Sequence, residues 1–205
     1  IDRSKKALKN AGLQLVENEL IVAAKDEAKE VILPLAKNDS VDALVLFSGT
    51  WVWASHMIGA LREFAKTGKG IVVWTYPGSQ GWRPVGGLVL KAALNEIGIK
   101  HRFVYGAAEE EDSLASVVSY CQASAVKNRI NMTTLAAFGG RGMGQTCGAA
   151  DPSQWMKTFG IDIDSRDTTE LLETAKAVKT AELDKAFRLI ESKFAEAPKR
   201  DAVAE

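Results

Sequence analysis

Short apolar runs and longer amphipathic stretches alternate along most of the chain, and glycines or prolines separate many of them. Runs of this length favour strands, and stretches with helical spacing favour helices. The expected strands are residues 13–22, 41–47, 70–76, 100–105, 133–138 and 161–164. The expected helices are residues 1–10, 25–37, 54–66, 85–97, 109–129, 152–159 and 168–197, with Pro34 kinking or ending the second and a break near Thr180 in the last. This alternation indicates βαβ units around a parallel sheet.

The predicted fold class is therefore α/β. We expect a three-layer αβα arrangement with a mostly parallel, Rossmann-like, doubly wound sheet. The chain has 205 residues, which is long for one domain and short for two. One domain followed by part of another is consistent with this length.

The chain is organised around residues 41–53, where an apolar run stops at Ser48-Gly49-Thr50 and Trp51 and Trp53 follow. Such a run is typical of a strand buried on both faces of a parallel sheet. Aromatic side chains just beyond its carboxyl end lie where open α/β sheets bind ligands. Packing between helix and sheet is the alternative for each tryptophan. We expect one of the two to face something other than the core.

The charge balance excludes several classes of partner. Lys plus Arg and Asp plus Glu each total 26, so no net field attracts nucleic acid or an anionic membrane. No apolar run is long enough to span a bilayer, and the first residues do not resemble a signal peptide. Cys121 and Cys147 have no metal-ligand spacing and suit a reducing compartment. We expect a soluble, cytoplasmic protein.

The polar motifs do not form a complete catalytic constellation or metal site. The glycine-rich residues 139–144 match neither the dinucleotide fingerprint nor a phosphate-binding loop, so a tight turn is favoured over a ligand cradle. His56 and His101 have no Cys, Asp or Glu at metal-ligand spacing and are expected to be structural or solvent-facing. The acidic run at residues 109–112 indicates a helix start.

Three aspartates at the end of the chain alternate along an expected strand and its exit. They are Asp162, Asp164 and Asp167. A surface edge, with Asp167 as a helix cap, explains them without a bound metal. We therefore predict no catalytic residue and no metal ligand in this sequence.

Four motifs in register resemble the L-fucose isomerase family. Residues 46–53 (LFSGTWVW) resemble the strand-to-loop region of its N-terminal domain, and residues 82–87 (WRPVGG) resemble its Arg-Pro-Gly loop. Residues 139–144 (GGRGMG) are similar to its Gly-Gly-x-Ser-Met-Gly turn, although Arg141 replaces the serine, and residues 153–171 continue the likeness. Arabinose isomerases share the architecture and match less well.

The resemblance implies a ketol isomerase that interconverts an aldose and a ketose, of the L-fucose/D-arabinose or L-arabinose type, through an enediol. The family uses a divalent metal, usually manganese, held by Glu, Asp and His in later domains. A first strand is expected before Ile1. The chain is thus expected to be a fragment, with an N-terminal α/β domain at residues 1–131 and the start of a second at 132–205. Alone it should be inactive and bind no metal.

The resemblance also implies which residues of the chain contact the substrate. In this family the first domain reaches into the active site of a neighbouring subunit of a hexamer, and a loop tryptophan contacts the sugar. Trp51 is the matching position, and an aromatic face suits the C–H face of a sugar. Arg83 is a second substrate-binding candidate that could equally anchor a subunit contact. The expected partners are a sugar, the remainder of the isomerase chain and further copies in a homo-oligomer.

Two other interpretations remain open from the sequence. One is a sugar-binding or regulatory domain with periplasmic-binding-protein-like architecture and no catalysis, and the other is an interaction module without a small-molecule site. In every case, an incomplete second domain should leave apolar strand faces, such as those of Leu135 and Ile163, without a covering layer.

Overall fold

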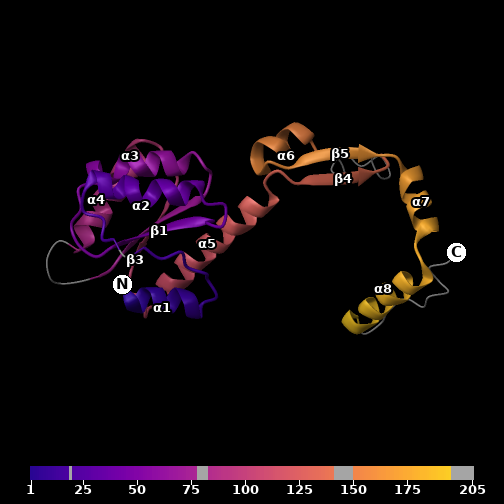
Figure 1. The fold of residues 1–205 in the computed structure, drawn as a ribbon, viewed down its shortest axis with the longest axis horizontal. Helices are drawn as coiled ribbons and strands as arrows, with labels where there is room; N and C mark the ends of the chain where they lie inside the picture. The colour runs from indigo at the N-terminus through magenta and orange to yellow at the C-terminus, as the bar shows by residue number, and fades with distance from the viewer. Residues whose placement is uncertain (19, 78–82, 141–149, 195–205) are drawn as a thin grey trace. The chain divides into compact units, whose positions relative to one another are not determined.

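A computed structural model describes residues 1–18, 20–77, 83–140 and 150–194 of the chain (Figure 1). The chain divides into two compact units, Ile1–Asn131 and Met132–Glu205, called unit 1 and unit 2 below. Each unit contains a parallel sheet with helices beside its strands. The predicted α/β class is confirmed. No described helix is long and apolar enough to cross a membrane.

Unit 1 contains a three-stranded parallel sheet in the order β1-β2-β3. Its elements are α1 (Asp2–Asn10), α2 (Lys25–Lys37), β1 (Ala43–Ser48), α3 (Ala54–Ala65), β2 (Gly70–Thr75), α4 (Arg83–Glu96), β3 (Arg102–Tyr105) and α5 (Glu111–Ile130). Ser48 is in register with Thr75, and Thr75 with Tyr105. Because the strands are parallel and in register, all three end at one edge of the sheet, which we call the carboxyl edge.

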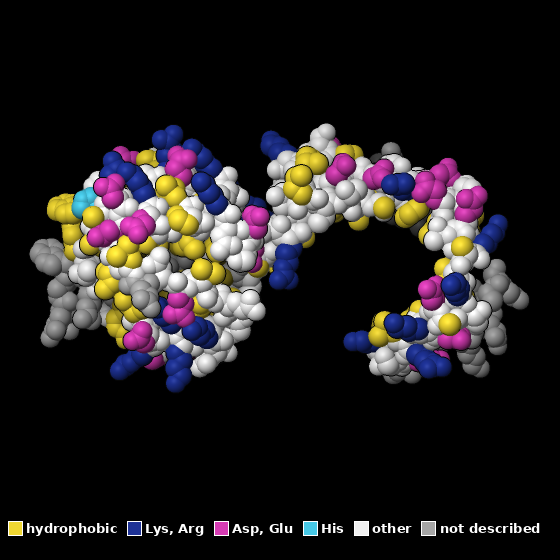
Figure 2. Space-filling view, in the orientation of Figure 1, with side chains coloured by type: hydrophobic (Ala, Val, Ile, Leu, Met, Phe, Trp, Pro, Cys, Tyr) yellow, Lys and Arg dark blue, Asp and Glu magenta, His cyan; other side chains and the backbone are white. Residues whose placement is uncertain are grey.

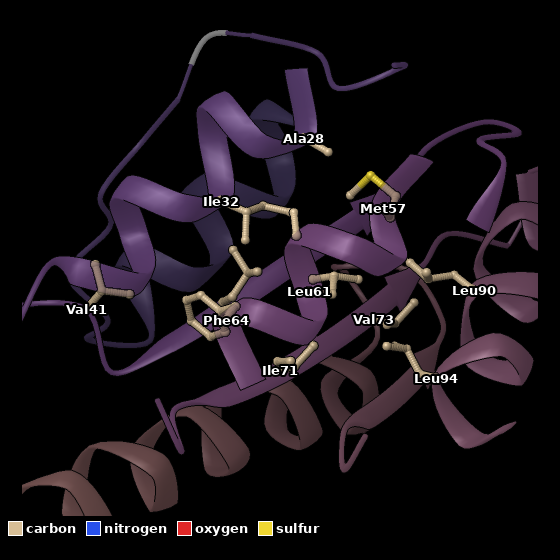
Figure 3. Packing of buried hydrophobic residues seen from close by; sticks show 12 residues of the cluster. Ala28, Ile32, Val41, Met57, Leu61, Phe64, Ile71, Val73, Leu90 and Leu94 are labelled. Atoms are coloured by element: carbon tan, nitrogen blue, oxygen red, sulfur yellow. The ribbon is translucent and has the colours of Figure 1, made fainter. Parts of the chain in front are cut away.

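Helices cover both faces of this sheet, so β2 is buried along its whole length. Ile71 and Val73 belong to a core cluster with residues of α2, α3 and α4, including Phe64 (Figure 3). Val72 and Trp74 point to the opposite face and pack with residues of α1 and α5. This alternation along one strand between two covered faces produces the three-layer arrangement.

The strand expected at residues 13–22 is not formed in its described part, and this prediction is wrong. Leu13 and Leu15 instead pack against the cluster that contains Trp74. The Glu17 carboxylate accepts a hydrogen bond from Lys5 at 2.9 Å and also contacts Lys9, both on α1. The alternating leucines therefore anchor a loop to the core and do not pair with a neighbouring strand.

The helix expected at residues 25–37 has these bounds in the structure, whereas several other expected boundaries shift by a few residues. Helix α2 continues past Pro34 to Lys37, so the proline does not end it. Helix α4 begins at Arg83, earlier than expected, and β5 continues to Arg166. The predicted break near Thr180 is confirmed, because α7 ends at Ala177 and α8 begins at Thr180.

Unit 2 contains a two-stranded parallel sheet and three helices among its described residues. They are β4 (Thr134–Phe138), α6 (Pro152–Phe159), β5 (Asp162–Arg166), α7 (Thr168–Ala177) and α8 (Thr180–Lys193). Asp151 caps α6 by accepting the amides of Ser153 at 2.9 Å and Gln154 at 3.1 Å. Gly160 ends α6 with a φ of 70°, a conformation that favours glycine.

None of the described residues of unit 2 is buried, although many are apolar. Leu135 is 44% exposed and Ile163 is partly buried. The other large apolar side chains that are exposed are Met132, Phe138, Met156, Phe159, Leu171, Leu172, Leu183, Leu189, Ile190 and Phe194. Hydrophobic side chains are visible on the surface of α6, β4 and β5 and of the helices that follow (Figure 2). The expectation of uncovered apolar side chains is confirmed for Leu135.

Candidate functional site

The candidate site lies at the carboxyl edge of the sheet in unit 1. Each strand ends in a short connection to the helix that follows it: residues 49–53 after β1, 76–82 after β2 and 106–110 after β3. Helices α3, α4 and α5 therefore all begin near this edge. Open parallel sheets bind ligands here because the connections and helix N-termini, and not the core, surround the strand ends.

Trp51 and Trp53 form an aromatic pair in the connection after β1. Their ring centroids are 5.3 Å apart and the ring planes meet at 84°, an edge-to-face arrangement. Trp51 is half-buried and Trp53 is 60% exposed. Between them, Val52 packs against the core cluster of Phe64, whereas neither tryptophan belongs to a core cluster of the described residues. The expectation that one of the two faces something other than the core is confirmed for Trp53.

Hydrogen bonds hold the strand ends of β2 and β3 together beside this pair. The Gly106 amide donates to the Thr75 carbonyl, and the buried Trp74 Nε1 donates to the Gly106 carbonyl, each at 3.0 Å. Tyr76 donates a long hydrogen bond of 3.4 Å to Glu109, whose carboxylate lies 3.5 Å from Arg3. Hydrogen bonds therefore link the residues that follow β2 and β3 at the carboxyl edge.

The start of α4 lies against the connection that carries Trp51. A Cβ atom built on Gly86 would be 2.6 Å from the Thr50 carbonyl oxygen and 3.2 Å from Trp51 Cα. Arg83 is the first residue of α4, one helical turn before Gly86. The structure thus brings the backbones of the two predicted substrate-binding positions to one region of the carboxyl edge. The Arg83 side chain and residue Trp82 lie outside what the structure describes.

Both histidines contact backbone carbonyl groups, as expected for structural residues. Nδ1 of His56 lies 2.9 Å from the Ala23 carbonyl oxygen, and Nδ1 of His101 lies 2.9 Å from that of Ile99. Within the described residues, no group of three or more His, Cys, Asp or Glu could hold a metal ion.

The aspartates of unit 2 serve structural roles. Asp167 accepts the Thr169 amide at 2.7 Å, which confirms it as the cap of α7. Asp164 pairs with Arg166 at 2.7 Å, and this pair raises the pKa of the guanidinium. Asp162 accepts the amide of Ile163. The hydrogen bond from Thr169 keeps the pKa of Asp167 below its usual value.

Two further motifs give no reactive group. Burial raises the pKa of the Cys121 thiol to about 11, so it stays protonated at neutral pH and is a poor nucleophile. Gly139 adopts a φ of 76° and donates its amide to the Arg166 carbonyl at 3.1 Å, which continues the pairing of β4 with β5. Arg141 and Cys147 lie outside the described residues.

Two of the open depressions among the described residues do not include the strand ends described above. One is lined by Lys5, Lys6, Lys9, Glu17 and neighbours on α1, and the other by residues 95 and 98–101. In the first, the Glu17 carboxylate already neutralises part of the lysine charge. The aromatic pair at the carboxyl edge is the stronger candidate because its exposed apolar area is otherwise unexplained.

Comparison with known proteins supports a coarse functional assignment. No family model matches the chain. A segment of 73 residues, 36% of the chain, is 33% identical to the sulfoquinovose isomerase of Clostridium sp. (strain MSTE9). Part of the chain is similar to a sugar isomerase. The matched segment covers 16% of the length of that relative, so most of the relative has no counterpart in the match.

The sequence located Trp51 just after a strand, as in the structure, but it did not reveal the structural importance of Gly86 and Gly87. These adjacent glycines appeared only as part of a family motif. Each glycine inside a helix costs roughly 1 kcal/mol relative to alanine, so two in the first turns of α4 are a signal in themselves. The signal indicates a close approach of another backbone, which is what the structure contains.

Proposed function

We propose that this chain is part of an aldose–ketose isomerase and that the carboxyl edge of unit 1 contacts the sugar. The Trp51–Trp53 pair carries the proposal, because it places aromatic surface at the ligand-binding edge of an α/β sheet and outside the core. The partial similarity to a sugar isomerase supports the same class of substrate. Trp51 contributes a flat apolar face for the C–H face of a sugar ring.

The edge-to-face geometry suits this role because each indole restricts the rotation of the other. Trp51 is half-buried, and Trp53 remains largely accessible. A ring that is already held in place loses little side-chain entropy when the sugar binds. In this proposal Arg83, at the start of α4, donates hydrogen bonds to sugar hydroxyls.

The proposed reaction moves a proton between C1 and C2 of the sugar through an enediol. We assign no catalytic residue to the described part of the chain. The manganese ion that the resemblance implies does not fit the described residues, because they contain no suitable ligand group. In the proposal, the metal and the acid–base groups belong to the remainder of the isomerase chain, which assembles as a homo-oligomer such as a hexamer.

Proton exchange tests the isomerase part of the proposal. The polypeptide that contains this chain, isolated as its source cell makes it, is incubated in D2O with manganese and L-fucose, D-arabinose, L-arabinose or sulfoquinovose. An enediol intermediate predicts deuterium at C2 of the aldose, detected by NMR, together with the ketose. Sugar binding without exchange would instead favour a sugar-binding or regulatory domain. If the polypeptide shows no exchange and binds none of these sugars, both interpretations are overturned.

Titration of the chain itself tests the contact surface. Tryptophan fluorescence should respond to one of these sugars, and Trp51→Ala should abolish the response. Trp155→Phe is the matched control, because Trp155 pairs with Phe159 in unit 2, at a ring distance of 5.6 Å, and is not part of the proposed surface. Equal sugar affinity in the wild type and Trp51→Ala would exclude Trp51 as the contact.

A further inference from the structure

Two adjacent glycines allow α4 to approach the carboxyl edge more closely than any other residue type would. Gly86 and Gly87 are both buried. A Cβ atom on Gly87 would lie 1.8 Å from Thr75 Oγ1, and one on Gly86 would lie 2.6 Å from the Thr50 carbonyl oxygen. Both distances are shorter than a Cβ atom tolerates, so the helix or its neighbour would have to move if either glycine were replaced.

The two glycines face different parts of unit 1. Gly87 faces a side chain of β2, so it determines how closely α4 packs on the sheet. Gly86 faces the backbone of the connection that carries Trp51, and its Cβ would also lie 3.2 Å from Ser48 Oγ and from Trp51 Cα. A backbone carbonyl cannot turn away as a side chain can. A methyl group at position 86 must therefore change the distance between α4 and residues 50–51.

Two further contacts hold the connection in place. Ser48 donates a hydrogen bond of 3.4 Å to the same Thr50 carbonyl that faces Gly86. Val52, immediately after Trp51, packs against the core. The backbone of Trp51 is thus fixed between a core contact and the surface of α4, and the position of its indole follows from that placement.

We propose that Gly86 is a positioning residue for Trp51. Its missing side chain sets the distance between α4 and residues 50–51, and this distance sets where the Trp51 indole lies relative to Trp53 at the carboxyl edge. The consequence for ligand binding rests on the proposed function, in which Trp51 contacts a sugar. The geometric part concerns the tryptophan pair alone and does not depend on that function.

Gly86→Ala tests the proposal, with Gly59→Ala as the matched control. Gly59 also lies inside a helix, α3, but a Cβ atom there would meet nothing within 4 Å. Alanine at position 59 should therefore leave the carboxyl edge unchanged. A difference between the two variants separates the contact with residues 50–51 from the general effect of replacing a helical glycine.

Two readouts are needed. The first is the circular dichroism signal of the coupled indoles, taken as the difference between each protein and the same protein with Trp53→Phe. The second is sugar affinity, measured by fluorescence titration. Gly86→Ala should change the pair signal and weaken sugar binding about tenfold or more, whereas Gly59→Ala should change neither. Urea unfolding of each variant checks that the protein is folded under the conditions in which these two signals are measured.

The outcomes distinguish the proposal from the function on which part of it rests. A changed pair signal in a wild-type background that binds no sugar supports the positioning role and counts against the proposed function. An unchanged signal and unchanged affinity in folded Gly86→Ala overturns the positioning role. If this variant is unfolded in buffer, trimethylamine N-oxide, which favours the folded state, allows the same two signals to be measured.

Discussion

Thr75 places a hydroxyl group in the core of unit 1 with no hydrogen-bond partner among the residues that the structure describes. Its side chain is fully buried at the end of β2, and Oγ1 occupies the space that a Cβ atom of Gly87 would need. A buried hydroxyl without a partner costs free energy, because it has lost its hydrogen bonds to water. The tight packing of α4 on the sheet is therefore achieved at the expense of one polar group.

Thr75→Val should raise the free energy of unfolding by about 1 kcal/mol, since valine has a similar shape and no polar atom to satisfy. Urea unfolding measures the change. Val73→Thr is the reverse control in the same strand: Val73 is fully buried, and a new hydroxyl there should lower the free energy of unfolding by about 1–3 kcal/mol. A destabilised Thr75→Val variant would show that the hydroxyl has a partner after all.

Glu17 makes the stability of unit 1 depend on pH in the acid range. Hydrogen bonds from Lys9 and then Lys5 lower the pKa of its carboxyl group from 4.5 to about 2. A carboxyl group whose pKa is lower in the folded state stabilises the fold above its unfolded pKa. This contribution is lost as the pH falls from about 4.5 to about 2.

The Glu17→Gln variant should accordingly be less stable than the wild type at pH 6, and the difference should vanish near pH 2. Unfolding by urea across this range measures it. Because the groups are exposed, 1 M NaCl should reduce the difference at pH 6 by screening the charges. A difference that stays constant from pH 6 to pH 2 would mean that the carboxylate charge does not contribute.

At the scale of elements, side chains of α5 form hydrogen bonds with residues at the amino ends of β1 and β2. Ser124 Oγ accepts the buried Gly70 amide at 2.8 Å and donates to the Asp42 carbonyl at 2.6 Å. Asn128, one turn later, donates to Asp42 Oδ1 at 3.0 Å. These side chains satisfy backbone groups at the end of the sheet opposite the candidate site.

Ser124→Ala removes both hydrogen bonds of this hydroxyl and should lower the free energy of unfolding by about 1–3 kcal/mol. Ser119→Ala, on the exposed side of the same helix, is the matched control. Its hydroxyl bonds only within the helix, to the Ser116 carbonyl, so the change should stay within about 0.5 kcal/mol. Equal losses in both variants would show that helix propensity, and not the attachment to the sheet, determines the result.

The same scale shows what the sequence could and could not predict. Apolar runs and helix-end signals located β1, β2 and α6 closely, because both depend on local sequence. The expectation that the run at 41–47 is buried on both faces is wrong, because β1 is an edge strand in which only Leu44 is buried. Alternation at Leu13 and Leu15 predicted a strand wrongly, because a period of two says which side chains share a face and not whether a neighbouring strand supplies hydrogen bonds.

The candidate site, too, could be predicted only in part from the sequence. Trp51 could be placed at the end of a strand from residues 41–53 alone. Its contact with Gly86 could not, because the two lie in different connections and only the packed sheet brings them together. No local pattern predicts how closely a helix approaches a distant loop, although the paired glycines of α4 indicated that something must approach there.

At the scale of the whole chain, the two units differ in how well they bury apolar surface. Unit 1 encloses its sheet between two core clusters. None of the residues that the structure describes in unit 2 is buried, and its sheet has two strands. Small sheets are marginally stable until they pack against further strands or helices. Unit 2 therefore has little burial to oppose the entropy of its unfolded state.

Hydrogen exchange on the complete chain should reveal this difference. Amides of β2 in unit 1 should exchange at rates near those set by global unfolding, because the strand is buried along its length. Amides of β4 and β5 should exchange at least about 100-fold faster, through local opening. Peptide-resolved mass spectrometry measures both, and β3, a short edge strand of unit 1, controls for edge position. Fast exchange in β3 as well would assign the effect to strand edges, whereas slow exchange in β4 and β5 would show that unit 2 is stable without a larger core.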